Sequence, residues 1–297
     1  MNYQWYPGHM TKAKRMMQEN IKLIDLVIEL VDARVPFSSR NPDIDELAKN
    51  KSRILLLNKF DLADEEYNKK WSNYFKGKGL YVVEIDSRSK SGMKNIQKAV
   101  QEACREKIER NRKRGIINRP VRAMVVGIPN VGKSTFINSF AGKACTKTGN
   151  KPGVTKGKQW IRLNKGLELL DTPGILWPKF EEQAVGMRLA FIGSMNDDIL
   201  NIDDLALELI RFLEKNYPGA LAERYGEDVL KRDEEGADKK TENALEILKR
   251  ICMNRRCYLK GEELDVPRAA SIVLDDFRNG KLGRITLEFP NETQPNP

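Results

Sequence analysis

The first 180 residues alternate between short apolar runs and stretches whose apolar residues recur at helical spacing. The apolar runs are rich in Val, Leu and Ile and predict strands at 26–31, 53–57, 80–85, 121–126, 158–163 and 167–171. The helical spacing predicts helices at 10–24, 43–50, 65–76, 92–114 and 134–140. Strands that alternate with helices predict an α/β fold, with a mainly parallel sheet and helices on both faces.

The pattern changes after Pro178, where helical spacing continues without intervening strands. Helices are expected at 181–193, 203–216, 241–253 and 267–279, with a break at Pro218 and Gly219 and a charged connector over 226–240. We therefore expect an α/β domain over 1–177, a small all-α C-terminal domain over 178–290, and a disordered tail over 291–297.

The composition is that of a globular protein with room for two buried cores, since 40% of the 297 residues are hydrophobic and 32% are charged. No apolar run reaches the roughly 18 residues of a membrane span, and the N-terminus lacks the layout of a signal peptide. The cysteines, Cys104, Cys145, Cys252 and Cys257, have no CxxC spacing. Reduced, mostly buried thiols and a cytoplasmic location are expected.

The net charge of +10 is unevenly distributed. Residues 1–177 contain 34 Lys and Arg against 18 Asp and Glu, whereas residues 178–297 contain 18 against 24. Within the acidic half, residues 249–284 reverse the sign, with nine basic and five acidic residues. This asymmetry favours a polyanionic partner that binds mainly the first half, although a solvated basic surface has the same composition.

Residues 127–134, Gly-Ile-Pro-Asn-Val-Gly-Lys-Ser, match the phosphate-binding pattern GxxxxGK[ST] between an expected strand and an expected helix. Glycines let backbone amides turn toward phosphate oxygens, and the helix N-terminus adds a favourable dipole. Lys133 is expected to bridge the β- and γ-phosphates as a catalytic residue, and Ser134 to bind Mg²⁺. The other nucleotide contacts predicted here are Pro129, Asn130, Val131, Gly132 and Thr135.

A second phosphate-side motif, Asp171-Thr-Pro-Gly174, lies 37 residues after Ser134 at the end of an expected strand. The DxxG pattern alone is common by chance, so its position carries the prediction. Asp171 is expected to hold Mg²⁺ through water, and the Gly174 amide to meet the γ-phosphate. Between the two motifs, Thr155 is predicted to be a catalytic residue that contacts both Mg²⁺ and the γ-phosphate.

Asn58-Lys-Phe-Asp61 directly follows an expected strand and is a guanine-recognition pattern. The Asp61 carboxylate can accept hydrogen bonds from N1–H and from the exocyclic amine of guanine. Adenine lacks this donor pair and would leave the anion unpaired, which disfavours an ATPase. Lys59 is expected to lie along the base and Asn58 to tie this loop to the phosphate loop. Ser87 and Arg88 are expected to give a backbone contact to the guanine oxygen.

The guanine motif precedes the phosphate loop, whereas Ras-like GTPases have the reverse order. The chain therefore resembles the circularly permuted GTPases of ribosome assembly. The resemblance extends to Pro7-Gly-His-Met10, to residues 32–42 (Asp-Ala-Arg-Val-Pro-Phe-Ser-Ser-Arg-Asn-Pro), and to residues 171–178. It is close enough to indicate the bacterial ribosome biogenesis GTPase A family over nearly the whole chain. It implies GTP hydrolysis coupled to late maturation of the large ribosomal subunit, and a helical C-terminal domain that contacts rRNA.

The water-orienting glutamine of Ras-type enzymes is replaced by Ile175, so hydrolysis needs another device. In the family that the chain resembles, the histidine of the PGHM motif is implicated in catalysis, which indicates His9. In similar GTPases an asparagine at the position of Asn130 helps bind an activating K⁺; turn geometry is the alternative reason for an asparagine there. Low intrinsic activity, stimulated by the large subunit, is expected.

Two basic segments are the predicted rRNA contacts, together with the helix over 10–24. Residues 105–119 contain seven basic and two acidic residues, and residues 143–158 contain five lysines and no acid. In the C-terminal half the predicted contacts are Arg255, Arg256, Lys260 and Arg278. The leading interpretation is a Mg²⁺-dependent GTPase that is monomeric off the ribosome. A GTP-gated RNA-binding module with negligible hydrolysis and a signalling GTPase with a protein partner are the alternatives.

Overall fold

The computed structural model describes residues 15–117, 119–145, 159–163, 166–172, 183–197, 200–230 and 240–291. Two compact units are present: one comprises Met1–Leu189 together with Thr286–Pro297, and the other comprises Ala190–Ile285. The first division therefore follows Leu189, whereas the sequence suggested 177. The described residues after Ile285 belong with the first unit, although the sequence grouped them with the helical domain.

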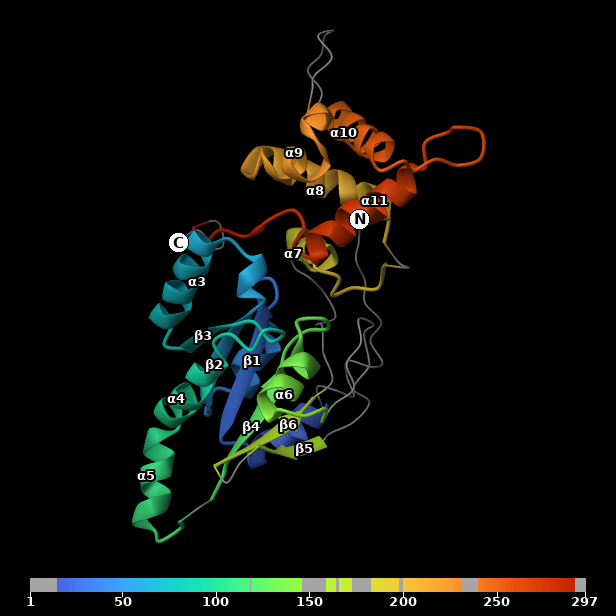
Figure 1. Ribbon diagram of the computed structural model, residues 1–297. Helices are drawn as coiled ribbons and strands as arrows, with labels where there is room; N and C mark the ends of the chain where they lie inside the picture. Colours follow the sequence, from blue (N-terminus) through green and yellow to red (C-terminus); the bar gives the residue numbers. More distant parts are fainter. Residues whose placement is uncertain are drawn as a thin grey trace. The chain divides into compact units, whose positions relative to one another are not determined.

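A six-stranded sheet in the order β3-β2-β1-β4-β6-β5 forms the centre of the first unit (Figure 1). The strands are β1 Leu26–Asp32, β2 Ser52–Asn58, β3 Tyr81–Ile85, β4 Val121–Val126, β5 Gln159–Arg162 and β6 Leu167–Asp171. Neighbouring strands are parallel except β5 and β6, which are antiparallel. The predicted mainly parallel sheet is confirmed, and β1 lies between the guanine-side and phosphate-side strands.

Helical segments of this unit follow the strands in the predicted alternation. They are α2 Asp43–Leu47, α3 Glu65–Gly77, α4 Met93–Ala103, α5 Arg105–Lys113 and α6 Lys133–Ala141, with short 3-10 helices at Ile21–Leu23 and Phe60–Leu62. The division after Leu189 falls within α7 Gln183–Phe191. Residues 15–20 are also helical. The Asp64 side chain starts α3 by accepting a hydrogen bond from the Glu66 amide at 2.8 Å.

The hydrophobic core explains why the strands are continuous apolar runs. All seven residues of β1 are buried. On one face of the sheet, Leu55 and Leu57 of β2 pack with Trp71 and Phe75 of α3. Side chains alternate along a strand, so the equally buried Leu56 points to the opposite face. Strands of a parallel sheet that is covered on both faces have apolar residues at nearly every position, as these strands do.

The helix expected over 92–114 is divided into α4 and α5 at Cys104. The Ser52 hydroxyl donates to the Ala103 carbonyl at 2.5 Å, next to this division. A side chain that bonds a helix carbonyl commonly interrupts the regular ladder. In Figure 1, α5 continues beyond α4 toward the turn that leads into β4.

The second unit is helical, as predicted. It contains α8 Ile202–Asn216, α9 Ala220–Tyr225, α10 Lys240–Asn254 and α11 Val266–Arg278, with a 3-10 helix at Glu227–Leu230. The sequence patterns did not predict α9, which is one and a half turns long. Its Arg224 and Tyr225 side chains donate to Asp276 of α11 at 2.8 and 3.2 Å. Across the part of the chain that the structure describes, no helix combines the length and apolarity needed to cross a membrane.

Candidate active site

The carboxyl ends of the parallel strands bring the predicted site residues to one edge of the sheet. Asp32 at the end of β1 is in register with Asn58 at the end of β2, and Val125 of β4 is in register with Asp171 of β6. The phosphate loop follows β4 at the same edge. Ligands of open α/β sheets bind at this edge, because the loops after the strands converge there.

Asn58 is a buried link between three loops. Its side-chain amide donates to the Val131 carbonyl at 2.6 Å, and its Oδ1 accepts from the Ser87 hydroxyl at 2.8 Å. The Ser139 hydroxyl of α6 in turn donates to the Ser87 carbonyl at 2.6 Å. The predicted connection between the guanine loop and the phosphate loop is therefore present in the structure.

The phosphate loop has the backbone that its glycines and asparagine permit. Asn130 and Gly132 have φ angles of 61° and 95°, in the left-handed region. A Cβ at Gly132 would lie 2.5 Å from Asn58 Nδ2, so the guanine loop approaches too closely for any side chain there. The glycine at this position serves the loop–loop contact as well as the turn.

Lys59 joins the guanine loop to the phosphate loop a second time. It has a left-handed φ of 59°, and its Nζ donates to the Asn130 carbonyl and to Asp32 Oδ2, each at 2.9 Å. The buried Arg34 donates to the same Asp32 carboxylate from Nε and Nη2, at 2.9 and 2.8 Å. Burial opposes ionisation of Asp32, but Arg34 and Lys59 hold its pKa well below the usual range.

Asp32 and Arg34 support the guanine loop, but no nucleotide-binding motif in the sequence contains them. They belong to residues 32–42, which carry the family resemblance without a stated role. The available signal was an acid at the end of an apolar strand followed closely by a base, a pattern that costs energy unless the two are paired. Their pairing positions Lys59, which is the base-side lysine of the guanine motif.

Lys133 begins α6 and is buried. Its Nζ donates to the Ile128 carbonyl inside the phosphate loop at 2.8 Å. Burial lowers the pKa of Lys133 to about 8, and the negative charge of Asp171 opposes that shift. Lys133 and Asp171 therefore act on one another electrostatically, and their contacts to the nucleotide phosphates and to Mg²⁺ stay predictions.

Ser134 and Asp171 fit the predicted Mg²⁺ site in their chemistry. A hydroxyl and a carboxylate are hard oxygen donors, and Mg²⁺ commonly takes few protein ligands and keeps several waters. Asp171 is buried at the end of β6, and the adjacent Thr172 hydroxyl fixes this strand end by donating to the Val125 carbonyl at 2.7 Å. Among the described residues no group of three or more His, Cys, Asp or Glu side chains could hold a metal ion.

Asp61 is exposed at the rim of the site, in the short helix after Lys59. Partial burial, followed by the neighbouring Asp86, raises its pKa. Asp86 accepts from the amides of Arg88 and Ser89 at 2.8 and 3.1 Å, and the Ser87 amide donates to Asn58 Oδ1 at 3.2 Å. Ser87 and Arg88 thus shape this loop, and their contact to the guanine oxygen stays a prediction.

Several predicted residues lie outside the described part of the chain. These are His9, Thr155 and Gly174, together with Lys147, Lys151, Lys156 and Lys158 of the basic segment. Pro129 and Thr135 lie within the described phosphate loop and the start of α6. The four cysteines are free, and three of them are buried.

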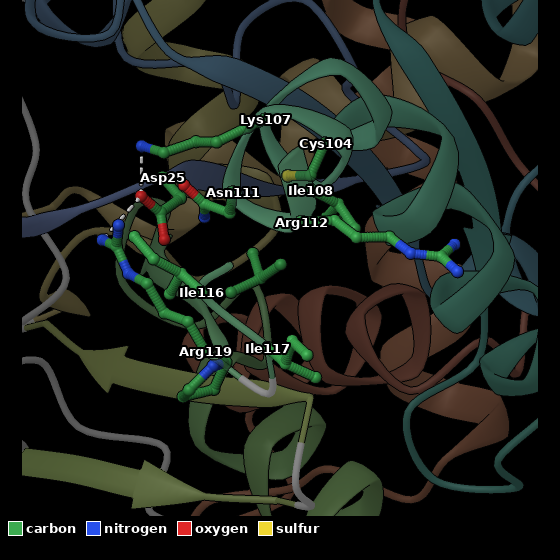
Figure 2. Close-up of a pocket in the computed structure, with 11 residues that line it drawn as sticks. Asp25, Cys104, Lys107, Ile108, Asn111, Arg112, Ile116, Ile117 and Arg119 are labelled. Atoms are coloured by element: carbon green, nitrogen blue, oxygen red, sulfur yellow. Dashed lines mark hydrogen bonds and ion pairs between the residues drawn. The ribbon is translucent and has the colours of Figure 1, made fainter. Parts of the chain in front are cut away.

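The basic joint between α5 and β4 contains a cavity of about 370 Å³. Figure 2 shows the Asp25 side chain between Lys107 and Arg119, with Ile116 and Ile117 beside them. Asp25 forms ion pairs with Lys107 and with Arg119, the latter at 3.4 Å. Lys107 and Arg119 belong to the segment predicted to contact RNA, and both are therefore also held by Asp25, the residue before β1.

Together, the phosphate loop, the guanine loop that precedes it in sequence and the parallel sheet define a circularly permuted P-loop GTPase. A family model described as 50S ribosome-binding GTPase matches residues 122–250. Ribosome biogenesis GTPase A of Bacillus cereus is 48% identical, with 98% of this chain and 95% of that protein covered. The protein of the same name from Thermotoga maritima is 32% identical, with 98% and 96% covered. The chain belongs to the ribosome biogenesis GTPase A family, which confirms the resemblance inferred from the motifs.

Solved structures are similar in fold as well. A GDP-bound structure of TM YlqF has a TM-score of 0.64 at 27% identity, and the match covers 93% of this chain and 100% of that one. GNP-bound YlqF from T. maritima has a TM-score of 0.63 at 27% identity, covering 94% and 98%. The protein is a GTPase that binds GTP and GDP, and P-loop GTPases generally use Mg²⁺.

Proposed function

We propose that the protein is a switch in late assembly of the large ribosomal subunit, with GTP hydrolysis stimulated by that subunit and contacts made to its rRNA. The observation that carries the proposal is the double link of Asn58 and Lys59 to the phosphate loop, which assembles a guanine nucleotide site. Relatives of nearly full length are named ribosome biogenesis GTPase A, and the matching family model is described as a 50S ribosome-binding GTPase.

In this function each part of the site has one task. Asp61 selects guanine through its two acceptor oxygens, and Lys133 places positive charge beside the β- and γ-phosphates. Ser134 and Asp171 would hold Mg²⁺, with Thr155 as a further ligand and Gly174 as a γ-phosphate contact. The bound ion neutralises charge on the phosphate oxygens. The chain's own contribution is to fix these groups in place before the nucleotide arrives.

Activation of the attacking water is assigned to His9 and to a K⁺ ion near Asn130. The left-handed backbone of Asn130 and the use of its carbonyl by Lys59 show that the residue also has a structural task. We therefore propose that the side chain of Asn130, and not its backbone carbonyl, contacts the K⁺ ion. Turnover in KCl and NaCl at equal ionic strength tests it, because equal rates would exclude selective activation by K⁺.

The rRNA contact is assigned chiefly to α5 and the residues after it. Arg110, Arg112 and Lys113 are exposed there, and the last turn of the helix is basic. In the helical unit, Arg278 donates to both oxygens of Asp197 at 2.7 and 2.8 Å, so its guanidinium already has a structural partner. Arg255, Arg256 and Lys260 are exposed and remain the proposed contacts of that unit.

The decisive experiment is GTP turnover by the full chain with purified large-subunit precursor, with mature subunit and without either. Stimulation by the precursor or the mature subunit supports the switch. GTP-dependent binding to the subunit without stimulated turnover would instead indicate a GTP-gated RNA-binding module. No binding in either nucleotide state would overturn the ribosomal function and favour a different partner. Analytical ultracentrifugation of the free protein tests the proposed monomer.

A further inference from the structure

The end of the described chain returns to the first unit in a short segment, Thr286–Phe289, which we call the return strap. The Leu287 amide donates to the Arg34 carbonyl at 2.8 Å. The Asp64 amide, at the start of α3, donates to the Thr286 hydroxyl at 3.1 Å. The strap thus bonds to the segment before the guanine loop and also to the segment after it.

Glu288 is the centre of the strap and is fully buried. Its carboxylate accepts from the amides of Phe37 and Ser38 at 2.7 and 2.9 Å, and from the Ser38 hydroxyl. Arg188 at 3.5 Å supplies the opposite charge. Burial raises the pKa of Glu288, and Arg188 and the donors of the loop oppose that shift. A buried carboxylate is tolerated only with such a set of partners, so the strap and the loop hold each other in place.

The loop that Glu288 holds is linked to the guanine-reading segment through the side chains of Arg34 and Asp32. Arg34 bonds to the strap through its carbonyl and to Asp32 through its guanidinium. Asp32 accepts from Lys59 at 2.9 Å, and Lys59 donates to Asn130 at the same distance. In this network Arg34 and Asp32 link the strap to Lys59, which lies two residues before Asp61. The strap follows the helical unit in the chain, so it also connects that unit covalently to this network.

We infer that Glu288 is a positioning residue for guanine recognition: the return strap fixes the loop after β1, and this loop fixes Lys59 and with it the placement of Asp61. The inference rests on the proposed role of Asp61 in reading the base. It also implies reciprocity, since a bound guanine must stabilise the strap as much as the strap stabilises binding.

The test compares affinity for GDP with affinity for inosine diphosphate, which lacks the exocyclic amine that Asp61 recognises. The first variant is Glu288→Gln in the full chain. It keeps the size of the side chain but replaces one acceptor oxygen by an NH₂ donor, which then faces a donor of the loop. Ser38→Ala removes a single hydrogen bond to the same carboxylate. The matched control is Glu106→Gln on the exposed side of α5. Affinities are measured by displacement of a fluorescent nucleotide below the onset of unfolding.

The preference for GDP over inosine diphosphate is expected to fall at least threefold in Glu288→Gln, and in the same direction by less in Ser38→Ala. Glu106→Gln is expected to keep the wild-type preference. A purely structural Glu288 would lower thermal stability and leave the preference unchanged, and that result in both folded variants overturns the inference. If Glu288→Gln does not fold, Ser38→Ala alone decides. Equal wild-type affinities would overturn base reading by Asp61 and the inference with it. The measurement uses the protein without ribosomes, so its result does not depend on whether the proposed role in ribosome assembly is correct.

Discussion

The side chain of Asn58 donates to the Val131 carbonyl at 2.6 Å and so joins the guanine loop directly to the phosphate loop. In this chain the guanine loop comes first and the phosphate loop later, with α3, β3, α4, α5 and β4 between them. The contact shows that permutation changes the order of the two loops along the chain while the strand ends still bring them together. We therefore expect nucleotide binding to weaken when this long-range contact is removed by a substitution in either loop.

Replacing Asn58 by Ala should weaken GDP and GTP binding by about 10- to 100-fold. The substitution removes the bond that holds the Val131 carbonyl of the phosphate loop, and one such buried loss costs roughly 1–3 kcal/mol, which covers this range. The Ser87 hydroxyl also loses its bond to the Asn58 side chain. Stopped-flow dissociation of a fluorescent GDP analogue measures the effect. Asn95→Ala on the exposed face of α4 is the control and should leave the rate unchanged. Wild-type dissociation from Asn58→Ala would show that the phosphate loop keeps its shape alone.

Replacing Asp61 by Asn should change which base the protein prefers. The amide has one acceptor atom instead of two and presents a donor where guanine also has a donor, so GDP affinity falls. Xanthine has a carbonyl in place of the guanine amine, and the new donor can pair with it. Competition binding with GDP and xanthosine diphosphate should show a loss for the first and a gain for the second. A parallel loss of both would indicate that Asp61 supports the loop without reading the base.

Lys133 should couple nucleotide binding to proton uptake at alkaline pH. Its pKa in the free protein is lowered to about 8 by burial, and phosphate groups beside it will favour the charged form. Above pH 8 part of the protein must therefore bind a proton when GDP binds, and GDP affinity should fall as pH rises. Below pH 7 Lys133 is charged in both states and contributes no uptake. Calorimetry in buffers of different ionisation enthalpy at pH 6.5 and 8.5 measures the difference, and equal proton uptake at both values would contradict it.

The parts of the fold and of the site that could be predicted are those that produce a recognisable pattern within a short stretch of sequence. Apolar runs indicated β1 and β2 because both faces of the sheet are covered. Gly132 and Lys133 belong to a motif because close backbone approach and phosphate charge require those residue types at fixed spacing. The sheet and the contact of Asn58 to the phosphate loop could thus be expected before the structure.

The network around Asp32 and the return strap could not be expected in the same way. Glu288 bonds to Ser38 across 250 positions of the chain, and its own segment has no unusual composition. Asp32 and Lys59 are paired because β1 and β2 are neighbours in register, which no spacing within either segment reveals. Sequence patterns report local backbone demands, whereas these buried ion pairs depend on which segments the fold brings together.

The buried acid of this network gives a final prediction, on stability. Replacing Asp32 by Asn removes the negative charge that pairs with buried Arg34 and with Lys59, and breaking a buried pair in this way costs about 3–5 kcal/mol. The matched control is Asp45→Asn: like Asp32, Asp45 pairs with two basic side chains, here Arg40 and Arg53, but its own side chain is 51% exposed. Solvent screening at this more exposed site should hold the cost below about 1 kcal/mol.

The same residue sets the sign of the pH dependence. Arg34 and Lys59 hold the pKa of folded Asp32 below its unfolded value of about 3.9, so the stabilisation is present above that pH and is lost as pH falls further. The difference in free energy of unfolding between wild type and Asp32→Asn should therefore be constant from pH 7 to 5 and shrink toward pH 3. Urea unfolding followed by tryptophan fluorescence can measure it, because buried Trp71 lies in the same unit as Asp32. A difference that stayed constant down to pH 3 would mean that the carboxylate charge of Asp32 is not what stabilises the network.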